Sequence, residues 1–260
     1  MPSIDLSDPG GVVEHIIERL GSIPIDYEER IGFIRSRNGT ADRWLAAGVI
    51  LLLHYHGGTG PGSGFMLQLI KRSALVPQPG DLSCPGGMLD PVTDRLLKLL
   101  VSSGLTPIMR GRARSLAKAR GAKTLNHISL FLTNALREAW EEVRISPLNV
   151  RFLGALPSRE LYVFSRVIFP VVGLVRKEWA FRPNREVERV IEIPLAALFE
   201  RERYGTLTVE IESTLPFRHE VEPVRNFPCF LYTPPGGREE VLWGATMSIV
   251  MNFLDIVFGF

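Results

Sequence analysis

Two short stretches decide the fold of this sequence: "CPGGMLD" at residues 84–90 and "ALREAWEEVRI" at residues 135–145. The first is a turn-type run, because two glycines after a proline allow backbone dihedrals that are closed to other residues. The second places Glu138, Glu141 and Glu142 on one face of a helix, because residues three and four apart are neighbours there. Such carboxylates repel one another unless a cation neutralises them, and Mg²⁺ takes oxygen ligands. Taken alone, a simple turn and a solvated acidic helix face are the alternatives.

The flanking sequence predicts an α+β fold with a mixed sheet. Apolar residues at helical spacing predict a helix at 9–20, and residues 43–72 have the pattern of a β-hairpin. The longest helical pattern runs from 126 to 145, with Asn126 as its N-cap. A further helix is predicted at 94–105, and strands at 150–157, 162–175, 186–194, 206–212 and 227–233. Strands and helices do not alternate regularly, which disfavours a doubly wound parallel fold.

Composition sets few constraints on the partners of this protein. The 260 residues carry a formal net charge of +2, so nothing in the charge requires a nucleic acid or a membrane. Cys84 and Cys229 form neither a metal-ligand spacing nor a disulfide framework, and a cytoplasmic location is expected. The apolar segment 242–260 contains Asn252 and Asp255. We therefore expect a buried helix there rather than a membrane anchor.

The two stretches together resemble the Nudix box. That box consists of a glycine, five residues, a glutamate, seven residues, and then Arg-Glu-apolar-x-Glu-Glu-x-Gly-apolar. Arg137, Glu138, Glu141 and Glu142 match its second half in order, and Gly87 matches its first glycine. The resemblance predicts that the two stretches form one site although they are far apart in the sequence.

This sequence departs from the box at three points. The first glutamate of the family falls on Thr93, and Asp94 comes one residue late. The late glycine of the family is Arg144 here. Thr93 and Arg137 are 44 residues apart where the family has 8, so about 36 residues are inserted. We therefore expect three parts: an N-terminal helical extension at 1–42, a Nudix domain at 43–260, and an insertion at about 94–130 within that domain.

The flanking segments resemble the coenzyme A diphosphatase-like branch of the Nudix superfamily. The matching segments are 69–87, 155–175, 183–199 and 242–254, so the resemblance covers roughly residues 43–257. It implies a Nudix-type α/β/α sandwich with a mixed β-sheet and a helical insertion. It also implies hydrolysis of the diphosphate in a nucleoside diphosphate linked to another group, with coenzyme A or an acyl-CoA as the first candidate. Two alternatives stay open: a diphosphatase for ADP-ribose, NADH or another nucleotide, and a catalytically degenerate ligand-binding protein.

The resemblance assigns roles to individual residues. Glu141 and Glu142 are expected to bind Mg²⁺ or Mn²⁺, and Glu138 to bind metal or to act as the base. Arg137 is expected to orient a glutamate, and Gly86 or Gly87 to offer a backbone carbonyl to the metal. A further carboxylate is expected from Glu186 or Glu188, for which a solvated strand edge is the alternative.

Other residues receive weaker predictions. Candidates for substrate binding are Arg72, Arg110, Arg114 and Lys118. The last three recur every four residues, so on a helix they would line one side, as a basic lid over the site or as a solvated surface. Leu96, Leu97, Leu99 and Leu100 offer a homodimer contact as a third interpretation. His54 and His56 are expected to be structural or rim residues, and Cys84 to be a packing residue rather than a nucleophile.

Overall fold

A computed structural model describes residues 5–40, 42–58, 62–210 and 224–260. Its central feature is a mixed sheet built around β1 (Leu45–His56), in which Ala47 and the run from Ile50 to Leu53 are buried. β1 pairs antiparallel with β2 (Gly64–Arg72) and with the short strand β4 (Gly86–Met88), and parallel with β7 (Arg166–Val175). The sheet also contains β3 (Leu82–Ser83), β5 (Val150–Ala155), β6 (Arg159–Leu161) and β8 (Val187–Pro194). The predicted hairpin and the mixed character of the sheet are confirmed.

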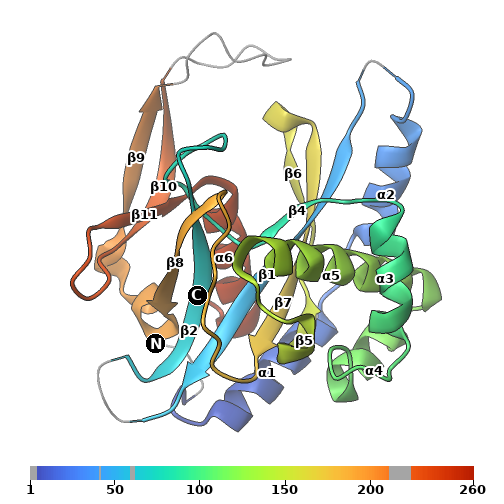
Figure 1. The fold of residues 1–260 in the computed structure, drawn as a ribbon, viewed down its shortest axis with the longest axis horizontal. Coiled ribbons are helices and arrows are strands. Elements are labelled where there is room, and N and C mark those ends of the chain that lie inside the picture. Colours follow the sequence, from blue (N-terminus) through green and yellow to red (C-terminus); the bar gives the residue numbers. More distant parts are fainter. Residues whose placement is uncertain (1–4, 41, 59–61, 211–223) are drawn as a thin grey trace.

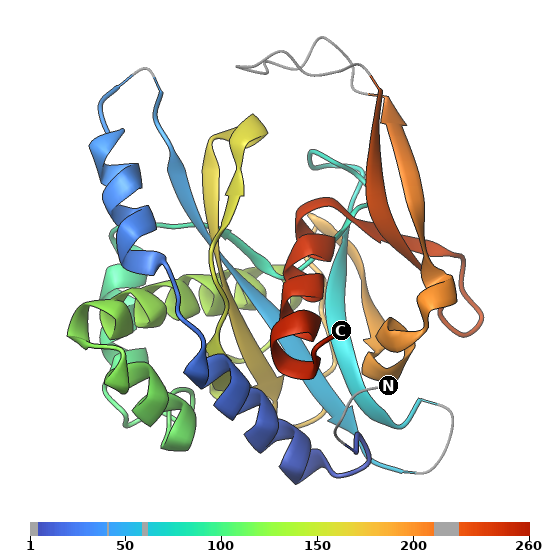
Figure 2. The ribbon, with the colours of Figure 1, turned by 180° about the vertical axis from the view of Figure 1, so that it is seen from behind.

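Helices cover both faces of this sheet, as an α/β/α sandwich requires (Figures 1 and 2). On one face lies α5 (Ala122–Val143), which packs on β1 and β4. On the other lie α1 (Pro9–Ser22), which contacts β5, and α6 (Gly244–Phe258). Each helix buries one apolar side, and these sides belong to one hydrophobic core with the sheet. The predicted α+β fold class is confirmed.

A smaller antiparallel sheet precedes the C-terminal helix. It consists of β9 (Tyr204–Glu210), β10 (Val224–Tyr232) and β11 (Glu240–Trp243). The next element, α6, buries Met247, Val250 and Phe253 among others, as expected for a core helix. In the described part of the chain, no helix is long and apolar enough to span a membrane.

The N-terminal segment contributes two helices, α1 and α2 (Tyr27–Ser36). Tyr27 is fully buried and donates a 2.7 Å hydrogen bond to the backbone carbonyl of Pro170 on β7. Ile16 and Ile17 of α1 are fully buried in the same core as the sheet. The extension expected at 1–42 therefore packs as part of the core, and its division from the rest of the chain stays a prediction.

The segment between the two halves of the box-like motif is helical. It contains α3 (Thr93–Ser102), α4 (Gly111–Ala119) and the first part of α5. The predicted N-cap Asn126 is wrong, because α5 already begins at Ala122 after Gly121, whose φ of 102° permits the turn from α4. Asn126 lies inside the helix, where its side chain accepts a hydrogen bond from Lys98 on α3. The chain thus leaves β4, forms a helical excursion and returns along α5.

Candidate active site

Asn134 fixes α5 against the central sheet at the point where the two halves meet. Its side-chain oxygen accepts a 2.7 Å hydrogen bond from the backbone N–H of Gly48 on β1. Its amide group donates a 3.1 Å hydrogen bond to the carbonyl of Met88 on β4. Asn134 is fully buried, and buried polar groups need such partners. The two bonds therefore select the face of α5 that meets β4.

Arg137 connects the carboxylates of the two halves. Its Nε donates to Oδ1 of Asp94 at 2.8 Å, and its Nη2 donates to Glu138 at 2.9 Å. Nη1 donates to both oxygens of Glu141, at 3.2 and 3.1 Å. Nη2 also donates to the carbonyl of Met88 at 3.2 Å. This guanidinium therefore orients the carboxylates on its own helix and ties them to β4 and α3.

The two glycines of β4 allow the glutamates to approach the sheet. The N–H of Gly86 donates a 3.1 Å hydrogen bond to Oε2 of Glu142. The φ of Gly86 is 151°, and a Cβ there would stand 2.4 Å from the carbonyl oxygen of Gly48. A Cβ on Gly87 would stand 2.5 Å from the carboxylate carbon of Glu138. Gly86 therefore requires glycine, whereas a side chain at Gly87 would displace the carboxylate of Glu138, and the predicted proximity of Gly86 and Gly87 to the glutamate helix is confirmed.

Burial strongly perturbs the charges of this site. It raises the pKa of Glu142 to about 8, although the N–H of Gly86 favours the ionised form, and the charge of Glu138 adds to the increase. Burial also raises the pKa of Glu138, against the effect of Arg137. Burial opposes the charged form of Arg137, but its hydrogen bond to Asp94 and the charge of Glu138 hold its pKa above the ordinary value. Ionised glutamates here are costly unless positive charge is supplied.

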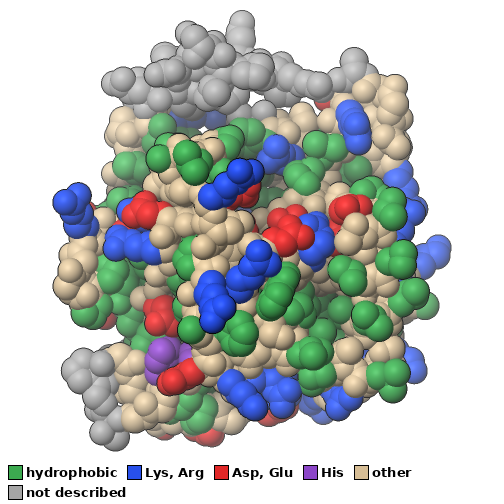
Figure 3. All heavy atoms as spheres, in the orientation of Figure 1, with side chains coloured by type: hydrophobic (Ala, Val, Ile, Leu, Met, Phe, Trp, Pro, Cys, Tyr) green, Lys and Arg blue, Asp and Glu red, His purple; other side chains and the backbone are tan. Residues whose placement is uncertain are grey.

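The donor set fits a hard divalent cation. Asp94, Glu138 and Glu141 present carboxylates around one guanidinium, and Glu142 adds a fourth carboxylate beside Gly86, so acidic groups outnumber this cation. In the view of Figure 3, acidic and basic side chains lie side by side near the middle of the visible surface. The three glutamates do not converge on one point, because Arg137 holds two of them while Glu142 turns to Gly86. Glu141 has a half-exposed side chain and is therefore able to rotate.

Of the two further carboxylates predicted, Glu186 lies close to the glutamates. Its charge acts on Glu142 and contributes to the raised pKa there, and the charge of Arg72 acts on the same carboxylate in the opposite direction. Glu188 instead lies 3.8 Å from Lys71, at a partly exposed strand edge. The positions of Glu186 and Arg72 agree with a place at the site, and the roles of all these residues stay predictions.

The basic residues of the excursion do not lie over the glutamates. Helix α4 packs on α1, on β5 and on α5. It is held by an ion pair from Arg112 to Glu18 and by hydrogen bonds from Arg120 to the carbonyls of Leu20 and Gly21. The packing of α4 on α1 supports the solvated surface over the basic lid, and substrate binding by these residues stays a prediction. Arg114 donates to the carbonyl of Ser102, and Arg110 and Lys118 are exposed.

Cys84 precedes the glycine pair and is buried. Burial raises the pKa of its thiol to about 12, and the charge of Glu142 adds to the increase. A thiol that stays protonated is a poor nucleophile. The prediction that Cys84 is a packing residue is therefore confirmed.

Two residues of this site were not given a role from the sequence. Asp94 is fully buried against Arg137, and it comes one residue after the position that the box assigns to its first glutamate. Asn134 lies three residues before Arg137 on the apolar side of α5. The sequence signal for Asn134 is a polar residue among the buried apolar positions of a helix.

Comparison with known proteins supplies the family. No family model matches the chain. A protein of Pectobacterium atrosepticum named "Uncharacterized Nudix hydrolase NudL" is 35% identical over 143 residues, which are 55% of this chain and 66% of that protein. A protein of the same name from Klebsiella pneumoniae is 32% identical over 145 residues, 54% of this chain and 74% of that protein. The chain thus spans just under two thirds of the first relative and about three quarters of the second.

Solved structures give a weaker likeness. A MutT/nudix family protein from Enterococcus faecalis aligns with 89% of this chain and 71% of its own, at 14% identity and a TM-score of 0.43. A C. elegans Ap4A hydrolase aligns with 60% of this chain and 84% of its own, at 12% identity and a TM-score of 0.37. Scores of this size do not establish a common fold by themselves.

The sequence relatives and the geometry agree. The identity to the Klebsiella protein extends over 74% of its length. In the structure, Gly86 and Met88 of β4 meet the Arg-Glu-x-x-Glu-Glu run of α5 through hydrogen bonds. On this evidence the chain belongs to the Nudix hydrolase family.

Proposed function

We propose that this protein is a metal-dependent diphosphatase that cleaves a nucleoside diphosphate linked to another group. The observation that carries the proposal is the joined site, in which Glu142 is buried and Arg137 is shared by three further carboxylates. An excess of carboxylates over cationic groups fits a bound divalent cation, and oxygen donors fit Mg²⁺ or Mn²⁺.

Glu141 and Glu142 are proposed to hold the cation, together with a backbone carbonyl of Gly86 or Gly87. When bound, the metal supplies charge neutralisation for a phosphoryl group and makes a bound water more acidic. Arg137 keeps the carboxylates oriented through its hydrogen bonds to Glu138 and Glu141. Orientation of this kind lowers the reorganisation needed during the reaction.

Glu138 is proposed either to bind metal or to accept the proton of the attacking water. Its pKa is raised by burial, which makes it a better base near neutral pH than an ordinary glutamate. Water adds to one phosphorus, the bridging oxygen leaves with the other phosphate, and the proton of the water passes to the base. The products are two monophosphates, and no covalent enzyme intermediate is needed.

Arg72 and Glu186 are proposed to complete the site. Both are close enough to Glu142 to change its pKa, in opposite directions. Arg72 is suited to a phosphate oxygen, since a guanidinium donates two hydrogen bonds to such a group. Glu186 offers the further carboxylate, with Glu188 as the alternative.

Coenzyme A or an acyl-CoA is the proposed substrate, on the resemblance of segments 69–87, 155–175, 183–199 and 242–254 to the coenzyme A diphosphatase-like branch. The proposed partner is therefore a small nucleotide, without nucleic acid or membrane, in the cytoplasm. A homodimer through α3 stays a prediction, and Leu96, Leu99 and Leu100 are exposed on that helix.

The test is hydrolysis by the purified protein with Mg²⁺ and a panel of coenzyme A, ADP-ribose, NADH and a dinucleoside polyphosphate. Glu141→Gln should lower the rate at least about a hundredfold at subsaturating Mg²⁺. The control Glu29→Gln, on the exposed side of α2, should keep the rate. Preference for ADP-ribose or NADH selects the first alternative. Ligand binding without hydrolysis of any panel member overturns the enzymatic proposal and selects a degenerate binding protein.

Substrate binding by the basic residues of the excursion has its own test. Arg110, Arg114 and Lys118 are replaced by serine, and KM is measured at two salt concentrations. A raised KM with weaker salt dependence supports their role, since exposed charges are screened by salt. An unchanged KM at both salt concentrations removes them from the site.

A further inference from the structure

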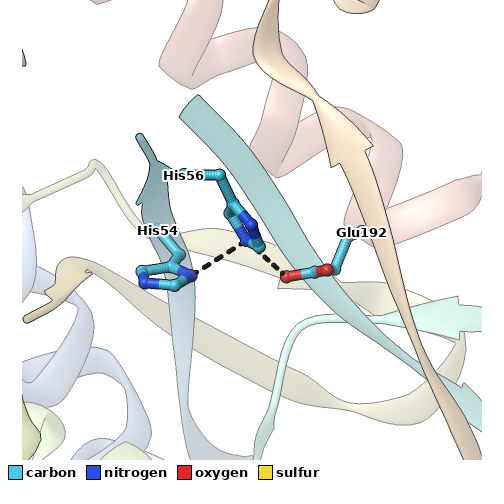
Figure 4. A group of neighbouring side chains, drawn as sticks. All are labelled: His54, His56 and Glu192. Carbon is cyan, nitrogen blue, oxygen red and sulfur yellow. Dashed lines mark hydrogen bonds and ion pairs between the residues drawn. The ribbon is translucent and has the colours of Figure 1, made fainter. Parts of the chain in front are cut away.

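A second cluster of metal-ligating side chains lies at the end of β1, away from the glutamates. His54 and His56 are two residues apart, so they project from the same face of the strand. The register pairs Leu52 with Gln68 and Gln68 with Glu192, which puts Glu192 of β8 on that same face. Figure 4 shows the two imidazoles and the carboxylate directed toward one another above β2.

The distances in this cluster match those of a metal site. Nδ1 of His54 lies 3.0 Å from Nε2 of His56, and that nitrogen lies 3.3 Å from Oε1 of Glu192. All three atoms lie within 4.8 Å of one another. Ligands about 2.0–2.1 Å from a tetrahedral zinc ion stand about 3.3 Å apart. Among the described residues, His54, His56 and Glu192 form the group of potential metal-ligating side chains whose donor atoms lie this close together.

Hydrogen bonding alone does not account for these contacts. An imidazole nitrogen has one in-plane position, which holds either a hydrogen or a lone pair. If Nε2 of His56 donates to Glu192, it has no lone pair left to accept from His54. If Nε2 of His56 instead accepts a hydrogen bond from His54, it carries no hydrogen. Two acceptors then face each other where this nitrogen meets the carboxylate of Glu192. One cation between the three atoms satisfies all of them.

The surroundings orient the donors and leave access to them. Gln68 is buried and its Nε2 donates a 2.9 Å hydrogen bond to Oε1 of Glu192. Its Oε1 has no hydrogen-bond partner among the described residues, and burying an unpaired acceptor lowers the stability of the fold. His54 is buried, whereas the side chains of His56 and Glu192 are 31% and 36% exposed. A Cβ at Gly64, the residue opposite His56, would meet no atom of the described residues within 4 Å.

We propose that His54, His56 and Glu192 form a binding site for a divalent transition metal of the zinc class. Two imidazoles and one carboxylate favour zinc, copper or nickel over Mg²⁺, which prefers oxygen ligands. The exposed side leaves a fourth position to water, as in zinc sites with three protein ligands.

This site is distinct from the glutamate site. Gly48 of β1 is the residue opposite Gly87, and His54 lies six residues further along the strand. At about 3.3 Å per residue, this separates the two positions by roughly 20 Å. On the face seen in Figure 3, histidine lies at the surface with acidic side chains next to it, apart from the central charged cluster.

A metal here would connect strands that are not neighbours. His54 and His56 lie on β1 and Glu192 on β8, and β2 lies between the two strands. A metal ion that binds the folded chain and not the unfolded chain stabilises the fold by mass action. Zinc should therefore raise the melting temperature, and the effect should depend on all three donors.

The test titrates metal-free full-length protein with Zn²⁺ against a chromophoric chelator, in millimolar Mg²⁺ to occupy the glutamate site. One zinc ion per chain is expected. His56→Ala and Glu192→Gln should each weaken zinc binding at least about tenfold, and the zinc-dependent rise in melting temperature should disappear. Glu141→Gln is the matched control, because it removes a carboxylate from the other site, and zinc affinity should stay unchanged.

Two outcomes overturn the proposal. One is zinc affinity unchanged in His56→Ala and Glu192→Gln. The other is zinc binding lost in Glu141→Gln, which would assign the ion to the glutamates. A second readout on the unmodified protein does not depend on variant folding. Co²⁺ in a four-coordinate site with imidazoles absorbs visible light far more strongly than Co²⁺ among six oxygens. Strong absorption that Zn²⁺ abolishes and excess Mg²⁺ does not supports the proposal, and weak absorption alone contradicts it.

Discussion

Asp94 and Arg137, 43 residues apart in the chain, form a buried ion pair with hydrogen bonds of 2.8 and 3.3 Å. Asp94 begins the helical excursion and Arg137 follows it, so this pair closes the loop at the site. The same aspartate accepts a 2.8 Å hydrogen bond from the N–H of Asp90. A buried charge with these partners fixes the guanidinium, which in turn holds Glu138 and Glu141.

Replacement of Asp94 should therefore impair catalysis without direct contact to the substrate. Asp94→Ala leaves Arg137 without its buried partner, which costs about 3–5 kcal/mol of stability in comparable pairs. We expect kcat to fall at least about tenfold, since the glutamates lose their orientation. Asp94→Asn should cost less, because it keeps the shape and part of the hydrogen bonding. Hydrolysis rates and thermal melts of both variants check this.

Thr93→Ala is the matched control. Thr93 occupies the position of the first glutamate in the linear pattern, yet its hydroxyl donates to Asp90, and it is Asp94 that accepts from Arg137. Its removal should leave kcat within about twofold, as expected for an exposed side chain. A larger loss in Thr93→Ala than in Asp94→Ala would reverse the assignment.

Glu142 should lower the stability of the metal-free protein at alkaline pH. Its folded-state pKa is about 8, against 4.5 for an unperturbed glutamate. As pH rises through this interval the unfolded chain loses the proton first, so it binds fewer protons than the folded chain. The free energy of unfolding therefore falls with pH over this window and stays reduced above it. Glu138 and Glu186 add to the effect, and Arg72 opposes it.

Glu142→Gln should remove this penalty and the activity together. In a chelator at a pH above 8, the variant should melt at least about 2 °C higher than the unmodified protein. Its hydrolysis rate should be at least about a hundredfold lower, since a metal ligand is lost. Addition of Mg²⁺ should stabilise the unmodified protein more than the variant. A variant that melts lower in chelator at that pH would contradict the buried, costly carboxylate.

The sequence predicted the parts of the fold that depend on local pattern. The hairpin of β1 and β2, the long helix α5 and the buried terminal helix α6 all follow from runs of apolar residues, and all are present. The glycine pair and the glutamate helix were expected to meet, and they do so through Gly86 and Glu142.

Other features depend on how distant segments pack. Whether Thr93 or Asp94 faces Arg137 depends on the rotation of α3, which spacing along the chain does not determine. The position of α4 depends on its contacts with α1, more than 80 residues earlier. The cluster of His54, His56 and Glu192 depends on the pairing of β2 with β8, which joins residues more than 100 positions apart.

Cys84→Ala should keep most of the hydrolytic activity. The thiol is buried and its pKa is about 12, so it neither ionises nor reaches solvent at neutral pH. For the same reason iodoacetamide should not label Cys84 in the folded protein at pH 8, but should label it after unfolding. Mass spectrometry of the labelled peptide measures this. Complete loss of activity in a correctly folded Cys84→Ala variant would count against hydrolysis by water and metal.

Arg144→Gly should stabilise the protein. α5 ends at Val143, and Arg144 follows in the left-handed conformation, with φ of 59° and ψ of 27°. Its N–H donates to the carbonyl of Trp140, which is the usual arrangement of a helix-ending glycine. Arg144 therefore ends the helix in the way that a glycine would. Its left-handed backbone conformation costs about 1–2 kcal/mol of strain. Glycine relieves the strain but gains freedom in the unfolded chain, so we expect a net gain of about 0.5–1 kcal/mol.

Arg144→Ala separates the backbone from the side chain in this prediction. The guanidinium of Arg144 lies 5.6 Å from the ring centroid of Trp140, and both variants lose this contact. Alanine keeps the strain, so Arg144→Ala should be equal to or less stable than the unmodified protein, whereas Arg144→Gly should be more stable. Denaturant unfolding of the three proteins measures the difference. Activity should stay within about twofold in Arg144→Gly, because the helix end and the position of Glu142 are retained. If both variants lose the same stability, the cation–π contact outweighs the strain, and the left-handed position does not need glycine.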